Sequence, residues 1–172
     1  DSISVYGLPV PVISSIANCV YDPVTFNSVT AIGDTTSYQY LWNFGDGFTS
    51  SIQSPTHQYA AAGNYNVSLT MINGNGCDAT ASITVDLSPA PDANFNFADA
   101  CAQSGVQFNN LTTISSGSIS TYNWNFGDGI SSTTAVPNHT YTNAGTYTVT
   151  LIATSSAGCK DTLILRNNIT VN

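Results

Sequence analysis

Charged residues are scarce in this sequence, and basic residues are almost missing. Only 7% of the 172 residues are charged, with two basic residues, Lys160 and Arg166, against ten acidic ones. At a net charge of −8 and with only these two basic residues, the chain has little with which to neutralise phosphates, which argues against nucleic acids and anionic membranes as partners. We therefore expect a polar surface made of Ser, Thr, Asn and Gln.

Long apolar runs and helical periodicity are also missing. No apolar stretch approaches the roughly 18 residues that a membrane-spanning helix needs, so we expect no membrane span. No signal peptide is recognisable, and we expect a mature or excised piece of a longer protein. Hydrophobic residues nevertheless make up 42% of the chain and alternate with polar ones, which predicts folded β structure and not disorder.

One hexapeptide occurs twice. The segment from Trp42 to Gly47 recurs letter for letter from Trp124 to Gly129, an offset of 124 − 42 = 82. A repeat period of 82 residues corresponds to a whole small domain and not to a solenoid turn of about 20–50 residues. The same offset, without a gap, links many further pairs, which include Cys19 and Cys101, Phe26 and Phe108, His57 and His139, Tyr65 and Tyr147, and Cys77 and Cys159.

The repeat predicts the domain organisation. We expect one domain over residues 8–88 and a second over residues 89–172, joined by a short linker that prolines stiffen. Residues 1–7 alternate and resemble the closing strand of the first copy, so we interpret them as the last strand of a preceding module. In the second copy Ile-Thr-Val ends 86 positions after its counterpart, which predicts four extra residues, as a bulge or longer loop, near 165–168.

Short alternating segments separated by turns predict an all-β sandwich. Tyr40, Trp42 and Phe44 share one face of the expected central strand, and the Asp46-Gly47 pair after them is typical of a two-residue hairpin turn. In the first copy we expect strands over residues 12–16, 24–29, 38–44, 55–59, 65–71 and 79–87.

Three ordered motifs carry a family resemblance. They are Trp-Asn-Phe-Gly-Asp-Gly at 42–47, Pro-x-His-x-Tyr at 55–59 and Gly-x-Tyr-x-Val-x-Leu at 63–69, and all three recur in the second copy. They resemble the signature of the PKD (polycystic kidney disease) domain, except that Asn43 and Asn125 replace the usual first Asp. The resemblance implies two immunoglobulin-like β-sandwiches. The cysteine positions resemble PKD modules of large secreted, adhesin-like proteins of gliding Gram-negative bacteria, cargo of the type IX secretion route, which implies an extracellular or cell-surface location.

The four cysteines are equally spaced in the two copies, at 77 − 19 = 58 and 159 − 101 = 58. None forms C-x-x-C and the histidines lie far away in sequence, so a zinc site is not expected. We favour disulfides Cys19–Cys77 and Cys101–Cys159. Two alternatives remain: a Cys19–Cys159 bond across the module junction, which leaves the other two for neighbouring modules, or free buried thiols.

Each side chain that could act in catalysis or ligand binding also has a structural interpretation, and we prefer the structural one. The tryptophans are expected in the core and not stacked on sugars. The aspartates are expected to build turns, since no second carboxylate is spaced for acid–base catalysis. The histidines, which lack a nucleophile motif, are expected to be neutral and hydrogen-bonded, and the tyrosines to form tyrosine corners. These structural residues are Trp42, Phe44, Gly45, Asp46, Gly47, His57 and Tyr65, with Trp124, Phe126, Gly127, Asp128, Gly129, His139 and Tyr147.

A calcium site is a weaker candidate, because some PKD domains of collagenases resemble calcium binders. The corresponding stretches are Gly33–Thr36, with one carboxylate, and Ser115–Ser118, with none. We therefore expect no catalytic residue, no metal and no cofactor.

The sequence thus predicts a non-enzymatic section of a long surface fibre or adhesin, a stiff spacer whose partners are neighbouring PKD-like modules and surface glycans or proteins. The alternative is an accessory module that binds substrate or carbohydrate for a secreted hydrolase. That role needs exposed aromatic residues. In the first copy the candidates for such an aromatic face are Tyr21, Tyr38 and Phe48. The equivalent residues of the second copy are Gln103, Ser120 and Ile130, so the aromatic face is not repeated, which favours the spacer.

Overall fold

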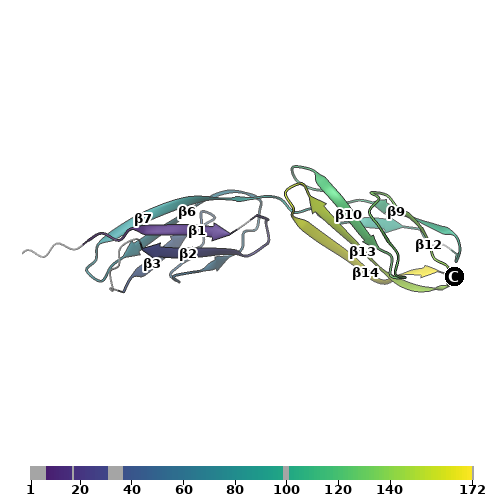
Figure 1. Ribbon diagram of the computed structural model, residues 1–172, viewed down its shortest axis with the longest axis horizontal. Helices are drawn as coiled ribbons and strands as arrows, with labels where there is room; N and C mark the ends of the chain where they lie inside the picture. Colours follow the sequence, from purple (N-terminus) through teal and green to yellow (C-terminus); the bar gives the residue numbers. More distant parts are fainter. Residues whose placement is uncertain (1–6, 17, 31–36, 99–100, 172) are drawn as a thin grey trace, which may run out of the picture. The chain divides into compact units, whose positions relative to one another are not determined.

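The structure, a computed structural model, describes residues 7–16, 18–30, 37–98 and 101–171. The chain divides into two compact units, Asp1–Ser88 (unit 1) and Pro89–Asn172 (unit 2). Figure 1 shows that both are built from strands, and no helix occurs in the described ranges. The predicted all-β fold with two tandem immunoglobulin-like sandwiches is confirmed. The strand expected over residues 1–7 falls almost wholly on residues outside the described ones.

Each unit packs a three-stranded sheet against a four-stranded sheet. In unit 1 the sheets have the orders β1-β2-β5 and β4-β3-β6-β7. In unit 2 they have the orders β12-β9-β8 and β11-β10-β13-β14. The strands of unit 1 are β1 (Pro11–Ile16), β2 (Val24–Thr30), β3 (Gln39–Asn43), β4 (Thr49–Ser50), β5 (Thr56–His57), β6 (Gly63–Ile72) and β7 (Asp78–Leu87). Those of unit 2 are β8 (Phe95–Phe97), β9 (Gly105–Asn110), β10 (Ile119–Asn125), β11 (Ser131–Ser132), β12 (Asn138–Thr140), β13 (Gly145–Ser155) and β14 (Lys160–Val171).

Alternation along the strands sends one set of side chains into the core between the sheets. In unit 1 the rings of Phe26, Trp42 and Phe44 meet at the centre, with 5.5 Å between the ring centroids of Phe26 and Trp42. The indole of Trp42 is fully buried, and so is that of Trp124 in unit 2. The core positions predicted for both tryptophans are therefore confirmed, and neither ring is available to a sugar.

The closing strand of unit 2 carries the predicted irregularity, but the insertion is smaller than predicted. Tyr147 pairs with Ile169, next to a register shift, whereas the equivalent Tyr65 pairs with Val85. The offset there is 169 − 85 = 84, so two residues are inserted near 165–168 and not four. An even insertion preserves the two-residue period, and Ile169, like Val85, still points into the core.

The predicted pairing of cysteines within each unit is wrong. Cys19 and Cys159 are disulfide-bonded, whereas Cys77 and Cys101 are free, so neither Cys19–Cys77 nor Cys101–Cys159 forms. In unit 1 the reason is the length of β7. Cys77 directly precedes β7, and Cys19 forms a bridge with Ser88, directly after it. The ten residues of β7 span about 34 Å, far more than the roughly 4.4–6.8 Å that a disulfide allows between Cα atoms.

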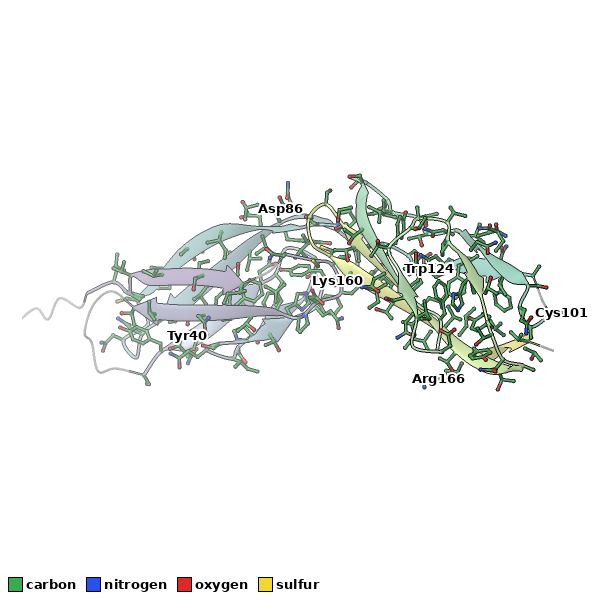
Figure 2. All side chains as sticks on the ribbon, turned by 45° about the vertical axis from the view of Figure 1, so that its right-hand side comes forward. Tyr40, Asp86, Cys101, Trp124, Lys160 and Arg166 are labelled. Carbon is green, nitrogen blue, oxygen red and sulfur yellow. The ribbon has the colours of Figure 1, made fainter. Side chains whose placement is uncertain are left out.

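Unit 2 separates its two cysteines in the same way. Cys159 directly precedes β14, and Asp161 near the start of that strand accepts a hydrogen bond from Ala93, just before β8. Strand β8 begins beside that end of β14, and Cys101 follows β8 along the chain. Figure 2 shows Cys101 and Lys160, the neighbour of Cys159, at opposite ends of the unit.

Candidate functional site

The Gly45-Asp46-Gly47 turn joins β3 to β4 and positions the only acidic side chain of the repeated motif. Gly45 and Gly47 have φ of 83° and 96°, which glycine adopts without strain. The amide of Phe44 donates to the carbonyl of Phe48 at 3.1 Å, so the loop has three residues and not the two predicted. With a glycine at positive φ on each side, the carboxylate of Asp46 bends back to accept from the amide of Phe48 at 3.2 Å.

The second carboxylate oxygen of Asp46 binds a histidine from β5. Nε2 of His57 lies 2.6 Å from Oδ2 of Asp46, and in unit 2 the atoms of His139 and Asp128 lie 2.8 Å apart. The side chains of His57 and Asp46 are only 13% and 16% exposed. Each aspartate therefore joins its hairpin turn to the opposite sheet through a largely buried hydrogen bond. A turn-building role for the aspartates and a hydrogen-bonded role for the histidines agree with these contacts.

Aromatic rings enclose the histidine. The imidazole of His57 stacks on Phe44, with ring centroids 4.2 Å apart and an interplanar angle of 6°. Tyr59 meets the same imidazole edge-on, at 4.6 Å and 80°. In unit 2, His139 makes the same two contacts, with Phe126 at 4.1 Å and Tyr141 at 4.5 Å. The ring is thus fixed by packing as well as by its hydrogen bond.

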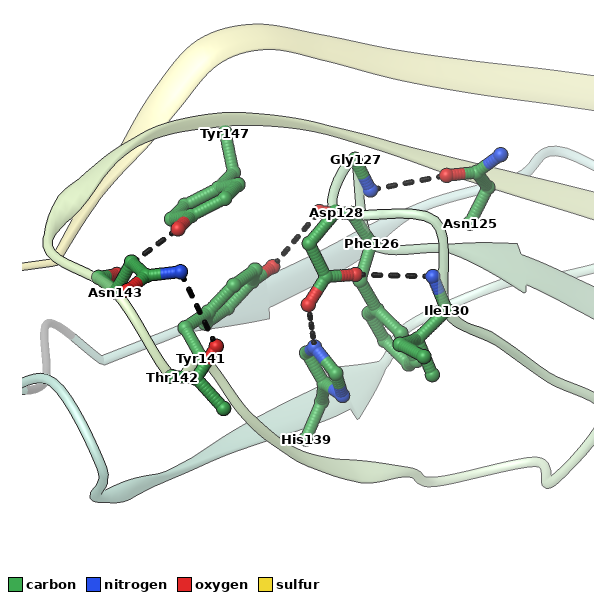
Figure 3. Close-up of polar contacts among 10 residues, drawn as sticks. All are labelled: Asn125, Phe126, Gly127, Asp128, Ile130, His139, Tyr141, Thr142, Asn143 and Tyr147. Carbon is green, nitrogen blue, oxygen red and sulfur yellow. Dashed lines mark hydrogen bonds and ion pairs between the residues drawn. The ribbon is translucent and has the colours of Figure 1, made fainter.

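The tyrosine beside each histidine completes the site. The hydroxyl of Tyr59 donates to the carbonyl of Phe44 at 3.0 Å, and that of Tyr141 donates to the carbonyl of Phe126 at the same distance. Figure 3 shows the contacts of Asp128, His139 and Tyr141 in unit 2. Burial raises the pKa of both tyrosine hydroxyls, and the nearby Asp46 or Asp128 carboxylate raises it further.

Aspartate and histidine are two of the three residue types in a Ser–His–Asp hydrolase triad, so we looked for the third beside them among the residues that the structure describes. A Ser–His–Asp enzyme needs a hydroxyl or thiol within hydrogen-bonding reach of the histidine nitrogen that does not face the aspartate. Within the described residues neither histidine forms a hydrogen bond with a serine, threonine or cysteine, and each binds its aspartate. The contacts described for this dyad are those that join a turn to a strand.

Two further aromatic positions have structural contacts. The indole Nε1 of Trp42 donates to the carbonyl of Ile52 at 3.0 Å, which satisfies its buried N–H. The hydroxyl of Tyr65 donates to the carbonyl of Ala61 four residues upstream, at 2.8 Å. Tyr147 repeats this bond with Asn143 at 2.9 Å, so both predicted tyrosine corners are present.

The aromatic candidates for a binding face are only partly exposed. Phe48 and Tyr21 are 66% and 61% exposed, whereas Tyr38 packs against the core of unit 1. The ring of Phe48 lies over His57, with centroids 5.6 Å apart. In unit 2 the position of Phe48 is held by Ile130, which has no aromatic face.

Across the described ranges no group of three or more His, Cys, Asp or Glu side chains could hold a metal ion. The Gly33–Thr36 stretch considered for calcium lies outside the described residues. The other stretch, Ser115–Ser118, carries no carboxylate. No helix in the described part is long and apolar enough to cross a membrane.

Sequence reasoning assigned roles to Asp46 and His57 separately and missed that they bind each other. One signal was available. The two residues lie 57 − 46 = 11 positions apart, and the equivalent pair in the second copy keeps that spacing. A repeated acid–histidine pair at a constant spacing favours direct contact between the two side chains.

Comparison with known proteins gives consistent matches. A sequence model of the PKD domain family matches residues 9–87 and again residues 88–171. The microbial collagenase of Vibrio alginolyticus is 43% identical over 72 residues, which cover 42% of this chain and 9% of the collagenase. Collagenase ColA of Bacillus cereus is 48% identical over 58 residues, 34% of this chain and 6% of that protein.

Among solved structures, the PKD1 domain of the Vibrio cholerae metalloprotease PrtV is 38% identical, with a TM-score of 0.45. The match covers 48% of this chain and 98% of that domain. The chain spans less than a tenth of the length of the two collagenases.

Proposed function

Because this chain belongs to the PKD domain family and contains two tandem copies of the domain, we propose that it is a non-catalytic structural and adhesive section of a long extracellular protein. This proposal depends on the finding that the polar groups of Asp46, His57 and Tyr59 all form structural hydrogen bonds. All three polar groups are engaged in bonds that hold the turn to the core, and the same set recurs in unit 2.

The path of the chain through each unit suits a spacer. In unit 1 the chain enters at the start of β1, and Cys19 lies beyond the other end of that strand. Ser88, the last residue of the unit, forms a parallel bridge with Cys19, so the chain leaves unit 1 at the end opposite to its entry. In unit 2, Ala93 lies beside the start of β14, and the chain leaves at the end of that strand. Entry and exit at opposite ends let each unit extend a chain by about 34 Å, the length of a ten-residue strand.

The proposed setting is the cell exterior. Disulfides persist in oxidising compartments, and Cys19 and Cys159 are oxidised. With only two basic residues the chain offers few sites to trypsin-like proteases, which suits exposure. The proposed partners are neighbouring PKD-like modules and surface glycans or proteins, and the net charge of −8 disfavours nucleic acids. The cysteine positions resemble those of PKD modules in secreted proteins of gliding bacteria, and we therefore propose that the parent protein is a surface adhesin exported by the type IX route.

The test of this function is turnover by the purified chain. Collagen, casein and common polysaccharides are incubated with the wild-type chain and with H57F, and released ends are quantified. We expect no product from either. Product formed by the wild type and lost in H57F would overturn the proposal.

A second candidate is an accessory substrate-binding module of a secreted protease. The observation in its favour is that two similar proteins are named collagenases, together with the exposed ring of Phe48. The discriminating experiment is sedimentation with insoluble collagen, with F48A compared with the matched I130A of unit 2. A pure spacer is expected to stay in the supernatant in all three forms. Retention that F48A abolishes and I130A preserves would favour the accessory role.

A further inference from the structure

The four cysteines occupy two equivalent positions in the repeat. Cys19 and Cys101 occupy the first position, after the first strand of each sandwich, and Cys77 and Cys159 occupy the second, before the closing strand. Unit 1 has its first-position cysteine bonded and its second-position cysteine free, and unit 2 has the reverse. The bonded set and the free set therefore each contain one cysteine of each position.

The loop at the second position has the same form whether its cysteine is bonded or free. The amide of Cys77 donates to the side chain of Asn73 at 2.9 Å, and the amide of Asn73 donates to the carbonyl of Cys77 at 2.9 Å. In unit 2, Cys159 makes the same two contacts with Ser155, at 3.1 and 2.8 Å. The free Cys77 thus lies in the backbone cradle that holds a bonded cysteine in the other copy.

The loop at the first position is preserved as well. Tyr21 and Gln103, each two residues after a first-position cysteine, have φ of 71° and 63° and are the non-glycine residues with positive φ in the described chain. Such a conformation is uncommon for bulky side chains and is kept only where its surroundings enforce it. Cys101 is exposed at the end of its unit. The loop after the free Cys101 therefore repeats the positive-φ position of the loop after the bonded Cys19.

From these three observations we propose that Cys77 and Cys101 are the two halves of a further disulfide, in which Cys101 of one copy of this tandem pair bonds Cys77 of another copy. A bond within one unit is excluded because its two positions lie at opposite ends of the sandwich. The bond links successive modules covalently and resists their separation under load. This inference rests on the proposed structural function, which it deepens.

The bond requires an oxidant, which we take to be a low-molecular-weight disulfide. The thiolate of one cysteine attacks that disulfide, forms a mixed disulfide and releases one thiol. The thiolate of the second cysteine then attacks the protein sulfur and releases the other thiol. In sum, two protein thiols lose two electrons and two protons, and one small disulfide is reduced to two thiols.

The test mixes two single variants of the purified chain. C77S retains free Cys101, C101S retains free Cys77, and each is incubated alone or with the other in oxidised glutathione. Non-reducing gels, intact mass and peptide mapping then measure the dimers. If the two module ends dock before they react, we expect roughly tenfold more heterotypic dimer, with a Cys77–Cys101 peptide, than either variant forms alone.

Homotypic dimers as abundant as heterotypic ones, or glutathione adducts without dimers, would overturn the inference. Equal thermal midpoints of both variants and the wild type check the fold. Should one variant not fold, oxidised wild-type chain must yield intermolecular Cys77–Cys101 peptides, and their absence counts against the bond. Neither result affects the turnover assay, so failure of this inference and failure of the proposed function are read separately.

Discussion

The hydroxyl of Tyr59 donates a 3.0 Å hydrogen bond to the carbonyl of Phe44, and both residues are buried. In Y59F the carbonyl loses this partner while the packing of the ring is kept. A buried polar group left without a partner costs about 1–3 kcal/mol. We expect Y59F to lower the free energy of unfolding by that amount in urea titrations of the chain.

The matched control is Y65F. The hydroxyl of Tyr65 also bonds a backbone carbonyl, that of Ala61, but at an exposed site where water can replace it. Its loss is expected to cost at most about 1 kcal/mol. Equal losses for Y59F and Y65F would contradict the assignment of Tyr59 to the buried support of the turn.

Alkaline pH should unfold the chain through the two buried tyrosines. Burial raises the pKa of Tyr59 and Tyr141 above the ordinary value of 10.0. The folded state therefore keeps these protons when the unfolded state has lost them. Their stabilising contribution is complete below pH 10 and declines as the pH rises above it, by about 1.4 kcal/mol per pH unit for each tyrosine.

Thermal midpoints measured between pH 8 and 12 check this dependence. Y59F, which has no phenol to titrate in unit 1, should show a shallower decline than the wild type. A decline of the same steepness in Y59F would show that other groups cause the alkaline unfolding.

Two replacements of Asp46 separate its roles. D46A removes both the acceptor for the Phe48 amide and the partner of His57. Since hydrogen bonds to charged groups contribute about 1.5–3 kcal/mol, we expect D46A to lower the stability of unit 1 by about that amount. D46N keeps an acceptor for the turn and can donate to the imidazole, so it should lose less. Differential scanning calorimetry compares them, with D128A and D128N as the equivalents in unit 2.

Two glycines of one turn should respond differently to alanine. A Cβ on Gly45 would lie 2.7 Å from the carbonyl oxygen of Asn66, whereas a Cβ on Gly47 meets nothing within 4 Å. Both have positive φ, which costs an L-residue about 1–2 kcal/mol. G47A should show that cost alone. G45A should lose clearly more, because backbone must also move, and chemical denaturation of both variants measures the difference.

The effect of a cysteine replacement on stability should depend on whether the cysteine is oxidised or free. C19S removes an oxidised cysteine, and loss of a native disulfide typically costs about 2–5 kcal/mol. C77S replaces a free thiol, so its thermal midpoint should stay near that of the wild type. Non-reducing peptide mapping of the monomeric chain, before any oxidant is added, is expected to recover Cys19 and Cys159, and not Cys77, in disulfide-linked peptides. A linked Cys19–Cys77 peptide would refute the observed states.

Sequence patterns predicted most of the scaffold because these features are local. Alternation placed Trp42 and Phe44 in the core, and the repeat offset extended that prediction to unit 2. The tyrosine corners followed from a Gly-x-Tyr motif whose bond spans four residues. The size of the insertion near 165–168 was misjudged because two Ile-Thr-Val segments look equivalent, whereas strand register, set by core packing, matches Ile169 with Val85.

By itself, then, the sequence determined the duplicated module, its all-β class and the residues that fill its core, since each depends on periodicity or turn chemistry within a few positions. Only the tertiary structure decided which distant groups meet. Strand β7 separates Cys19 from Cys77 by its whole length, and the packing of a hairpin on the opposite sheet brings Asp46 to His57. Such contacts depend on where strands begin and end in space, which no local pattern records.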